Sequence, residues 1–178
     1  MSYTAVERPS LGASAEFETV FLAHYDRIAR VITRVVNDPA RAEEIAAEVF
    51  WKYWRKARNA SGDPGGWLYR VAVRMALDDL RRHTRRLRRE REQTVRGATT
   101  PEEIHSLAED RDRVRLVLAT LNPRDAELLL LRADDLTYSD IAESLGLNPA
   151  SLGTLLSRAQ QAFRKEYVKQ YGQLRNEQ

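Results

Sequence analysis

Residues 139–159, SDIAESLGLNPASLGTLLSRA, have the spacing of two short helices joined by a tight turn. Ala142 is small where the two helices would cross, and Gly146 follows four residues later, where the chain must turn sharply. Asn148 can cap the second helix, and Pro149 suits its first turn because the missing N–H costs nothing there. The pattern predicts a helix-turn-helix, and its plain alternative is an ordinary helical hairpin.

The second helix of this pair divides into an apolar face and a polar face. The apolar positions recur at three- and four-residue steps, at Leu152, Leu155, Leu156, Ala159 and Phe163. The opposite face carries Ser151, Thr154, Arg158, Gln161 and Lys165. A helix-turn-helix places the first part of this helix in the major groove, where hydroxyl groups discriminate between bases only weakly. We therefore expect readout of shape and phosphate with Arg158 as the main cation, the alternative being a solvated face.

The rest of the chain also has helical periodicity, and its helix starts are well marked. An N-cap side chain precedes a proline at Asp38-Pro39, Asp63-Pro64, Thr100-Pro101, Asn122-Pro123 and Asn148-Pro149. Thr137 with Asp140 can form a capping box. No long run alternates apolar and polar residues, and β-branched residues are scattered, so strands are not expected. The sequence predicts an all-α protein.

The helical sequence falls into two blocks, which predicts two small domains on a flexible linker. The first block, residues 16–89, contains all three tryptophans and has its own core. The second, residues 111–172, resumes the apolar spacing and holds the helix-turn-helix. Between them, residues 90–110 are poor in large apolar groups and are expected to form the linker. Residues 1–15 are expected to be a disordered tail, and residues 173–178 a second, polar tail.

A dense basic cluster ends the first block. Between Arg81 and Arg91 there are seven arginines and a single acid, Glu90. Arginines neutralise phosphates, and nearby aromatic rings can stack on unpaired bases, so this density favours nucleic-acid binding. The alternative is a solvated helix end.

Composition excludes several other functions. The absence of cysteine removes disulfides, thiolate nucleophiles and cysteine zinc sites, and His24, His83 and His105 are too scattered to form a metal site. No nucleophile, base and orienting group are grouped as an enzyme requires, so we expect neither catalysis nor a cofactor. No apolar run is long enough to span a bilayer, and the N-terminus lacks the pattern of a signal peptide. We therefore expect a cytoplasmic protein without membrane insertion.

Three stretches together resemble a known family: FETVFLAHYDRIARVITRVVNDPARAEEIAAEVFWKYWRKA (17–57), GGWLYRVAVRMALDDLRR (65–82) and LNPRDAELLLLRADDLTYSDIAESLGLNPASLGTLLSRA (121–159). They are similar to the two conserved domains of an extracytoplasmic-function sigma factor of bacterial RNA polymerase, in the sigma-70 family. The order, the spacing and the linker match the minimal form that lacks the middle domain of larger sigma factors.

The resemblance implies three surfaces. The residues expected to dock on core RNA polymerase are Glu44, Glu48, Phe50 and Trp51. Those expected to bind the proximal (minus 10) promoter element, an unstacked base included, are Arg58, Asn59, Trp67, Arg70, Arg74, Arg81, Arg82 and Arg85. Those expected to read the upstream (minus 35) element are Ser151, Thr154, Arg158 and Gln161. The expected partners are core RNA polymerase, promoter DNA and an anti-sigma factor that would cover the docking surfaces.

Three positions or runs differ from what is usual in the resembled family. Ala47 stands where a glutamine is usual, and Arg74 where an asparagine is usual. The recognition helix lacks two common cations, so weak upstream recognition by the isolated second domain is expected, with strength supplied by the polymerase tether.

Two other functions remain open from the sequence. A sigma-like decoy would bind a regulator and never touch promoters, and the missing cations fit it, whereas the arginine cluster does not. A simple helix-turn-helix repressor would leave the first block and its aromatic loop unexplained.

Overall fold

The computed structural model describes residues 11–57, 64–94, 106–134 and 136–172. All regular elements in these ranges are helices, and the all-α prediction is confirmed. The elements are α1 (Leu11–Val36), α2 (Pro39–Ala57), α3 (Pro64–Thr94), α4 (Ser106–Thr120), α5 (Pro123–Ala133), α6 (Tyr138–Leu145) and α7 (Pro149–Tyr171).

The helix starts follow the proline signals of the sequence. Helices α2, α3, α5 and α7 each begin at the proline of an Asx-Pro pair. Asn122 and Asn148 accept a hydrogen bond from the backbone two residues on, which satisfies one of the free N–H groups at the start of α5 and α7. The pair Thr100-Pro101 lies outside the described residues. α1 begins at Leu11, within the segment expected to be a tail, and α3 extends to Thr94, within the expected linker.

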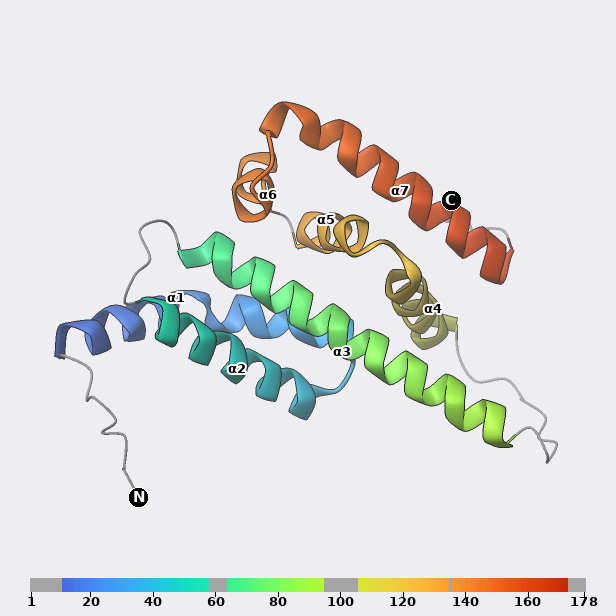
Figure 1. Ribbon diagram of the computed structural model, residues 1–178, viewed down its shortest axis with the longest axis horizontal. Coiled ribbons are helices and arrows are strands. Elements are labelled where there is room, and N and C mark those ends of the chain that lie inside the picture. The colour runs from blue at the N-terminus through green and yellow to red at the C-terminus, as the bar shows by residue number, and fades with distance from the viewer. Residues whose placement is uncertain (1–10, 58–63, 95–105, 135, 173–178) are drawn as a thin grey trace, which may run out of the picture.

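The first three helices form a bundle around an aliphatic core. α1 and α2 are joined by a short turn in which Asn37 takes a left-handed conformation, φ 58°, which asparagine tolerates better than most residues. α3 packs along both of them (Figure 1). The fully buried side chains that meet here include Ile28, Ile32, Ile45, Val49, Leu68, Val73 and Leu77.

The second half contains the predicted helix-turn-helix, formed by α6 and α7 and braced by α5. Thr137 and Asp140 exchange the two hydrogen bonds of a capping box at the start of α6. Gly146 ends α6 with φ 63°, a left-handed conformation that a side chain would strain. α7 is long and lies on the outer side of α5 and α6, away from α3 (Figure 1).

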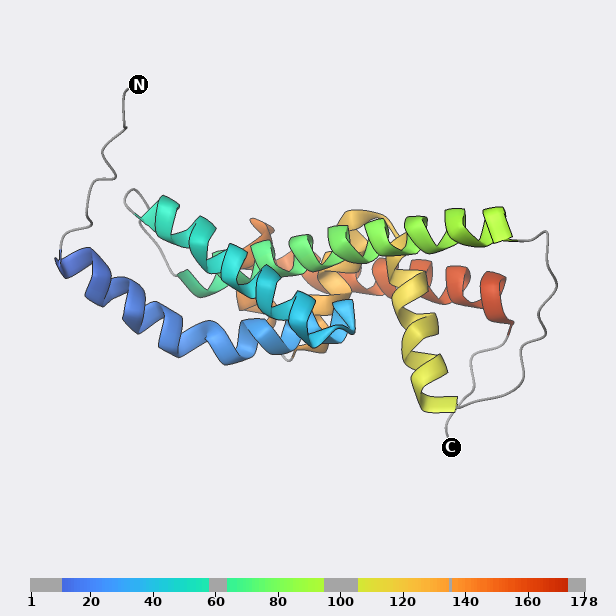
Figure 2. The same cartoon turned by 90° about the horizontal axis from the view of Figure 1, so that it is seen from below.

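The two halves pack on each other through α3. This long helix has α1 and α2 on one side and α4, α5 and α6 on the other (Figures 1 and 2). One continuous hydrophobic cluster includes Leu68 and Leu77 of α3 together with Leu128 of α5 and Ile141 of α6. α3 is therefore the element on which both halves of the chain assemble.

None of the described helices combines the length and apolar character required to cross a membrane. The same residues contain no group of His, Cys, Asp or Glu side chains arranged to hold a metal ion.

Candidate nucleic-acid and polymerase interfaces

Four arginines of α3 and one tryptophan form a stripe along one side of the helix. Trp67, Arg70, Arg74, Arg81 and Arg85 share this side because their spacings of three, four and seven residues return to the same face. Arg70 is half-buried and Arg85 is exposed. We call this set the α3 stripe. It brings together most of the residues expected to bind the proximal promoter element.

Trp67 lies at the start of the stripe and is partly covered. Its ring centroid is 5.9 Å from that of Tyr53, and the Lys56 Nζ atom is 5.2 Å from the centroid of the Trp67 ring. The Trp67 ring is also partly buried against the hydrophobic core, so it is only partly accessible for stacking. Arg58 and Asn59, which precede α3 in the sequence, lie outside the described residues.

Two arginines of the stripe contact the second half of the chain. Arg74 donates two hydrogen bonds to Glu127 of α5, at 2.8 Å from Nε and 3.3 Å from Nη2. Glu127 is buried, with a side chain only 7% exposed, and Arg74 is the ion-pair partner that compensates its charge. Arg81 donates to the carbonyl oxygens of Ala119 and Leu121, at 3.3 and 3.2 Å, where α4 ends.

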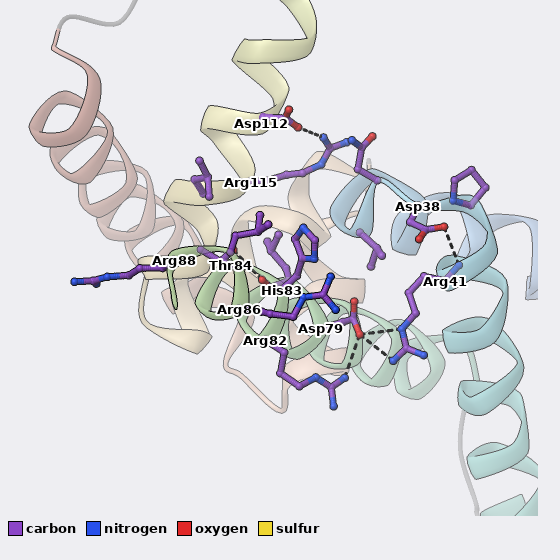
Figure 3. A pocket seen from close by; sticks show the side chains of 16 residues that line it. Asp38, Arg41, Asp79, Arg82, His83, Thr84, Arg86, Arg88, Asp112 and Arg115 are labelled. Carbon is purple, nitrogen blue, oxygen red and sulfur yellow. Dashed lines mark hydrogen bonds and ion pairs between the residues drawn. The ribbon is translucent and has the colours of Figure 1, made fainter. Parts of the chain in front are cut away.

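Beside the stripe, α3 lines a groove of about 1080 Å³ whose other walls come from the α1–α2 turn and from α4 (Figure 3). Asp79 accepts hydrogen bonds from Arg41 and Arg82, at 2.9 and 3.2 Å. Hydrogen bonds to Glu44 and then to Asp79 raise the pKa of Arg41 above its ordinary value. Arg82 is thus engaged within the protein, although its side chain remains largely exposed.

The predicted reading face of α7 is open to solvent. Ser151, Thr154, Arg158 and Gln161 are all exposed, as their spacing predicts. Ser151 Oγ donates to the carbonyl oxygen of Asn148 at 2.8 Å, which leaves its lone pairs available to a ligand. Gly153 lies beside them without a side chain, so a second molecule can approach the backbone closely there.

The predicted polymerase-docking residues of α2 do not all reach the surface. Glu44, Glu48 and Trp51 are exposed, and the Trp51 side chain is 59% exposed, which is unusual for so large an apolar group. Phe50 is instead in the core, 2% exposed, with its ring centroid 4.9 Å from that of Phe21. Phe50 therefore packs in the core and does not itself form part of the exposed surface of α2.

Sequence reasoning missed the charged contacts that hold the two halves together. Asp134, at the end of α5, is buried and lies 3.6 Å from Arg27 and 3.3 Å from Arg34, both on α1. Arg115 of α4 also donates to the carbonyl oxygen of Arg34, at 2.9 Å. The sequence held one signal of such contacts. Glu127 is an acid within the apolar run of α5, and a buried acid requires a positively charged partner.

A capped helix-turn-helix with an exposed polar face, joined to a second helical unit with a stripe of arginines, defines the class of helix-turn-helix nucleic-acid-binding proteins. Comparison with known families gives a narrower assignment. Residues 20–86 match the model of Sigma-70 region 2, and residues 111–162 match that of Sigma-70, region 4.

Characterised relatives agree with these matches. The chain is 30% identical over 157 residues to an ECF RNA polymerase sigma factor, SigK, of Mycolicibacterium vanbaalenii, covering 82% of this chain and 80% of the relative. It is 29% identical over 169 residues to the ferric citrate uptake sigma factor FecI of Escherichia coli, covering 90% of this chain and 98% of the relative.

A solved structure shares the fold. It is the sigma factor RpoE in complex with the anti-sigma factor NepR from Bartonella quintana, with a TM-score of 0.50 at 16% identity, covering 85% of this chain and 96% of that one. The chain belongs to the extracytoplasmic-function sigma factors of bacterial RNA polymerase. As a sigma factor it binds core RNA polymerase and directs it to promoter DNA.

Proposed function

We propose that the three sigma-factor tasks are divided among three helices of this chain. The α3 stripe binds the proximal promoter element, the exposed face of α7 reads the upstream element, and α2 docks on core RNA polymerase. The observation that carries this assignment is the presence of two separate surfaces suited to nucleic acid, on α3 and on α7, within one chain.

For α3, the proposal rests on charge and spacing. Arginines that repeat along one side of a helix can follow a phosphate backbone, and each phosphate contact contributes affinity that falls with salt. Trp67 lies at the end of the stripe where an unstacked base would be received. Arg85 is exposed, and within the described part of the chain its Nε atom donates to the carbonyl oxygen of Arg81, one helical turn back.

For α7, the proposal rests on an open but weakly charged face. Ser151 and Thr154 offer hydroxyls and Arg158 offers one cation, so readout depends on shape and phosphate more than on bidentate base contacts. Upstream affinity is then modest for the second domain alone, and the polymerase tether raises the effective concentration.

For α2, an exposed tryptophan beside two exposed carboxylates provides a compact docking patch. Tryptophan is among the residues that most often dominate binding energy at protein interfaces. Trp51 with Glu44 and Glu48 lies on one side of α2 at three- and four-residue spacing.

Under the same proposal the protein catalyses no reaction and works in the cytoplasm, where the polymerase is located. An anti-sigma factor is included among its partners. The support is family membership, together with a structural neighbour that was solved bound to the anti-sigma factor NepR.

The test is transcription from a pooled library of random promoters with core RNA polymerase and the full-length chain, followed by sequencing of transcript starts. Discrete starts that share two spaced elements are the expected result. Replacing Arg70 and Arg85, two arginines of the α3 stripe, with alanine should reduce those starts, whereas Arg111→Ala, an exposed arginine on α4, should not. Absence of both polymerase binding and discrete starts would overturn the proposal and favour the sigma-like decoy.

A further inference from the structure

A second pocket lies where α6 meets α1 and the first turn of α3, outside the three surfaces assigned above. Its volume of about 230 Å³ is below the roughly 300–1,000 Å³ of pockets that hold drug-sized ligands, so it suits a small molecule. Neither the α3 stripe, nor the reading face of α7, nor the docking patch of α2 contributes to its walls. The residues that decide its chemistry are Arg27 of α1, Gly65 and Gly66 of α3, and Asp140, Glu143 and Ser144 of α6.

Ser144 brings to this pocket a buried hydroxyl that has no partner. The residue is 3% exposed, and its Oγ atom makes no hydrogen bond within the described part of the chain. The hydroxyl lies against the first turn of α3, because a β-carbon built on Gly66 would be only 3.0 Å from it. A buried hydroxyl without a hydrogen bond costs free energy, and nearly all buried polar groups in proteins have a partner. We therefore expect a molecule in the pocket to supply the partner of Ser144.

The side of the pocket at α3 favours a negative charge. The first N–H groups of a helix have no partner within the helix, and the helix dipole makes this end positive. Gly65 is buried in the first turn of α3 and has no side chain to cover its N–H group. Arg27 adds a cation. Its Nε and Nη2 atoms contact Asp134, which leaves the N–H groups of Nη1 for another acceptor. These donors together suit a carboxylate.

The side of the pocket at α6 favours a positive charge. Asp140 and Glu143 are exposed and three residues apart on α6, so their side chains share a face of this helix. Asp140 already accepts a hydrogen bond from the backbone N–H of Thr137 through Oδ2, which leaves Oδ1 for a ligand. Glu143 has no ion-pair partner in the part of the chain that the structure describes. An ammonium group, with three N–H donors, suits two neighbouring carboxylates.

A ligand with only one of these charges would meet an unfavourable group on the other side of the pocket. A simple anion at α3 would lie near Asp140 and Glu143, and a simple cation at α6 would lie near Arg27 and the positive end of α3. A molecule that carries both charges close together suits both sides. Free α-amino acids have this arrangement, because their ammonium and carboxylate groups are on the same carbon atom.

We infer that this pocket binds a free α-amino acid with a small side chain. The carboxylate accepts hydrogen bonds from the Gly65 N–H, the Ser144 hydroxyl and Arg27. The ammonium group donates to Glu143 and Asp140. The inference does not depend on which helix binds which promoter element. Because α1 and α3 form one side of the pocket and α6 the other, a bound amino acid also stabilises the folded chain by linkage.

The test compares three probes that differ mainly in charge. L-Alanine carries both charges, propionate lacks its ammonium group and ethylamine lacks its carboxylate. Each probe is titrated at constant pH and ionic strength into the full-length protein labelled with nitrogen-15, and the backbone amide signals are followed by NMR. L-Alanine should shift the signals of Gly65 and Ser144 saturably and should bind at least tenfold more tightly than either of the other probes.

Three outcomes would overturn the inference. Equal affinity for propionate and L-alanine would indicate a simple anion site, and equal affinity for ethylamine and L-alanine a simple cation site. No saturable shift with about 50 mM L-alanine, which would fill a site of millimolar affinity, would mean that water alone occupies the pocket. None of these outcomes bears on the proposed function, because the titration contains neither polymerase nor DNA.

Two substitutions test the two sides of the pocket separately. Ser144→Ala removes the hydroxyl and Glu143→Gln removes one negative charge, and each should weaken the binding of L-alanine at least fivefold. The matched controls on α7, Ser157→Ala and Glu166→Gln, should bind like wild type. Ser144→Ala should not lower the unfolding temperature of the ligand-free protein, because the hydroxyl has no partner to lose. Wild-type affinity in Ser144→Ala or in Glu143→Gln would contradict the assigned contacts.

Discussion

The carboxylate of Asp134 accepts a hydrogen bond from the guanidinium of Arg34 at 3.3 Å, although 100 residues separate the two in sequence. Arg27 lies on the same carboxylate at 3.6 Å and also donates to the backbone oxygen of Asp134. Two arginines of α1 therefore hold the end of α5, where the helix dipole also favours positive charge.

This arrangement predicts an asymmetry between removing the acid and removing the arginines. Asp134→Asn should lower the free energy of unfolding by about 1 kcal/mol, because the side chains of Arg27 and Arg34 are 46% and 58% exposed and can be solvated by water in its place. Arg27→Ala with Arg34→Ala should cost about 3 kcal/mol, because the side chain of Asp134 is 8% exposed and would remain as an uncompensated charge. Urea unfolding measures both, and equal losses would contradict this account.

The two glycines of the helix-turn-helix should respond in opposite directions to alanine. Gly146→Ala should destabilise the protein by about 1–2 kcal/mol, because a φ of 63° is unfavourable for a residue with a side chain. Gly153→Ala should stabilise it by about 0.5–1 kcal/mol, because its added β-carbon would lie 3.9 Å from the nearest atom and alanine favours helix. Thermal or urea unfolding of the two variants and of wild type measures the change in the free energy of unfolding. Changes of the same sign would contradict the assigned conformations.

Arg158 should contribute a phosphate contact to upstream recognition. Arg158→Ala should weaken binding of holoenzyme to an upstream element selected from the pool, and should reduce the slope of log affinity against log salt by about one unit. Arg164→Ala is the matched control, since Arg164 is exposed on another face of α7. If both variants lose the same affinity, the contact is not specific to the proposed face.

Trp51 should be more important for polymerase docking than for folding. Because its side chain is 59% exposed, Trp51→Ala should change the free energy of unfolding by about 0.5 kcal/mol or less. Its affinity for core polymerase should fall by about 2 kcal/mol if it anchors the interface. The dissociation constants of wild type and of Trp51→Ala are measured on core polymerase immobilised on a sensor surface. Undiminished affinity would exclude Trp51 from the interface.

Tyr69 should make stability depend on pH in the alkaline range. Burial raises the pKa of Tyr69 from 10.0 to about 12, with the Arg27 charge opposing and the Asp134 charge adding to this rise. The contribution of Tyr69 to the free energy of unfolding is fully present below the unfolded pKa of 10. It is lost as the pH rises to about 12, because the tyrosine releases its proton in the unfolded chain at a lower pH than in the folded protein. The unfolding free energy of wild type should fall by up to about 2 kcal/mol relative to Tyr69→Phe across this window. Parallel curves for the two proteins would contradict the shift.

Local features of this fold could be read from the sequence because their causes are local. An Asx-Pro pair satisfies or removes the free N–H groups of the helix that it starts, so Pro39, Pro123 and Pro149 mark helix starts without reference to the rest of the molecule. The same holds for the left-handed Gly146. The exposed face of α7 followed from periodicity alone.

Residues that depend on distant partners could not be placed in this way. Phe50 was grouped with Trp51 by motif, but adjacent residues of a helix point in different directions, and Phe50 continues the buried side that Ala46 and Val49 share. Arg74 and Glu127 come from separate helices 53 residues apart, so no local pattern links them. The sequence alone does not distinguish an arginine that binds a phosphate from an arginine that pairs with a carboxylate of the same protein.

The contact between α3 and α5 also depends on how the two helices are joined. Because both helices belong to one chain, the fraction of molecules in which Arg74 contacts Glu127 is set by an effective concentration that does not change with the amount of protein. Dilution, which separates the subunits of a complex, therefore leaves this contact unchanged.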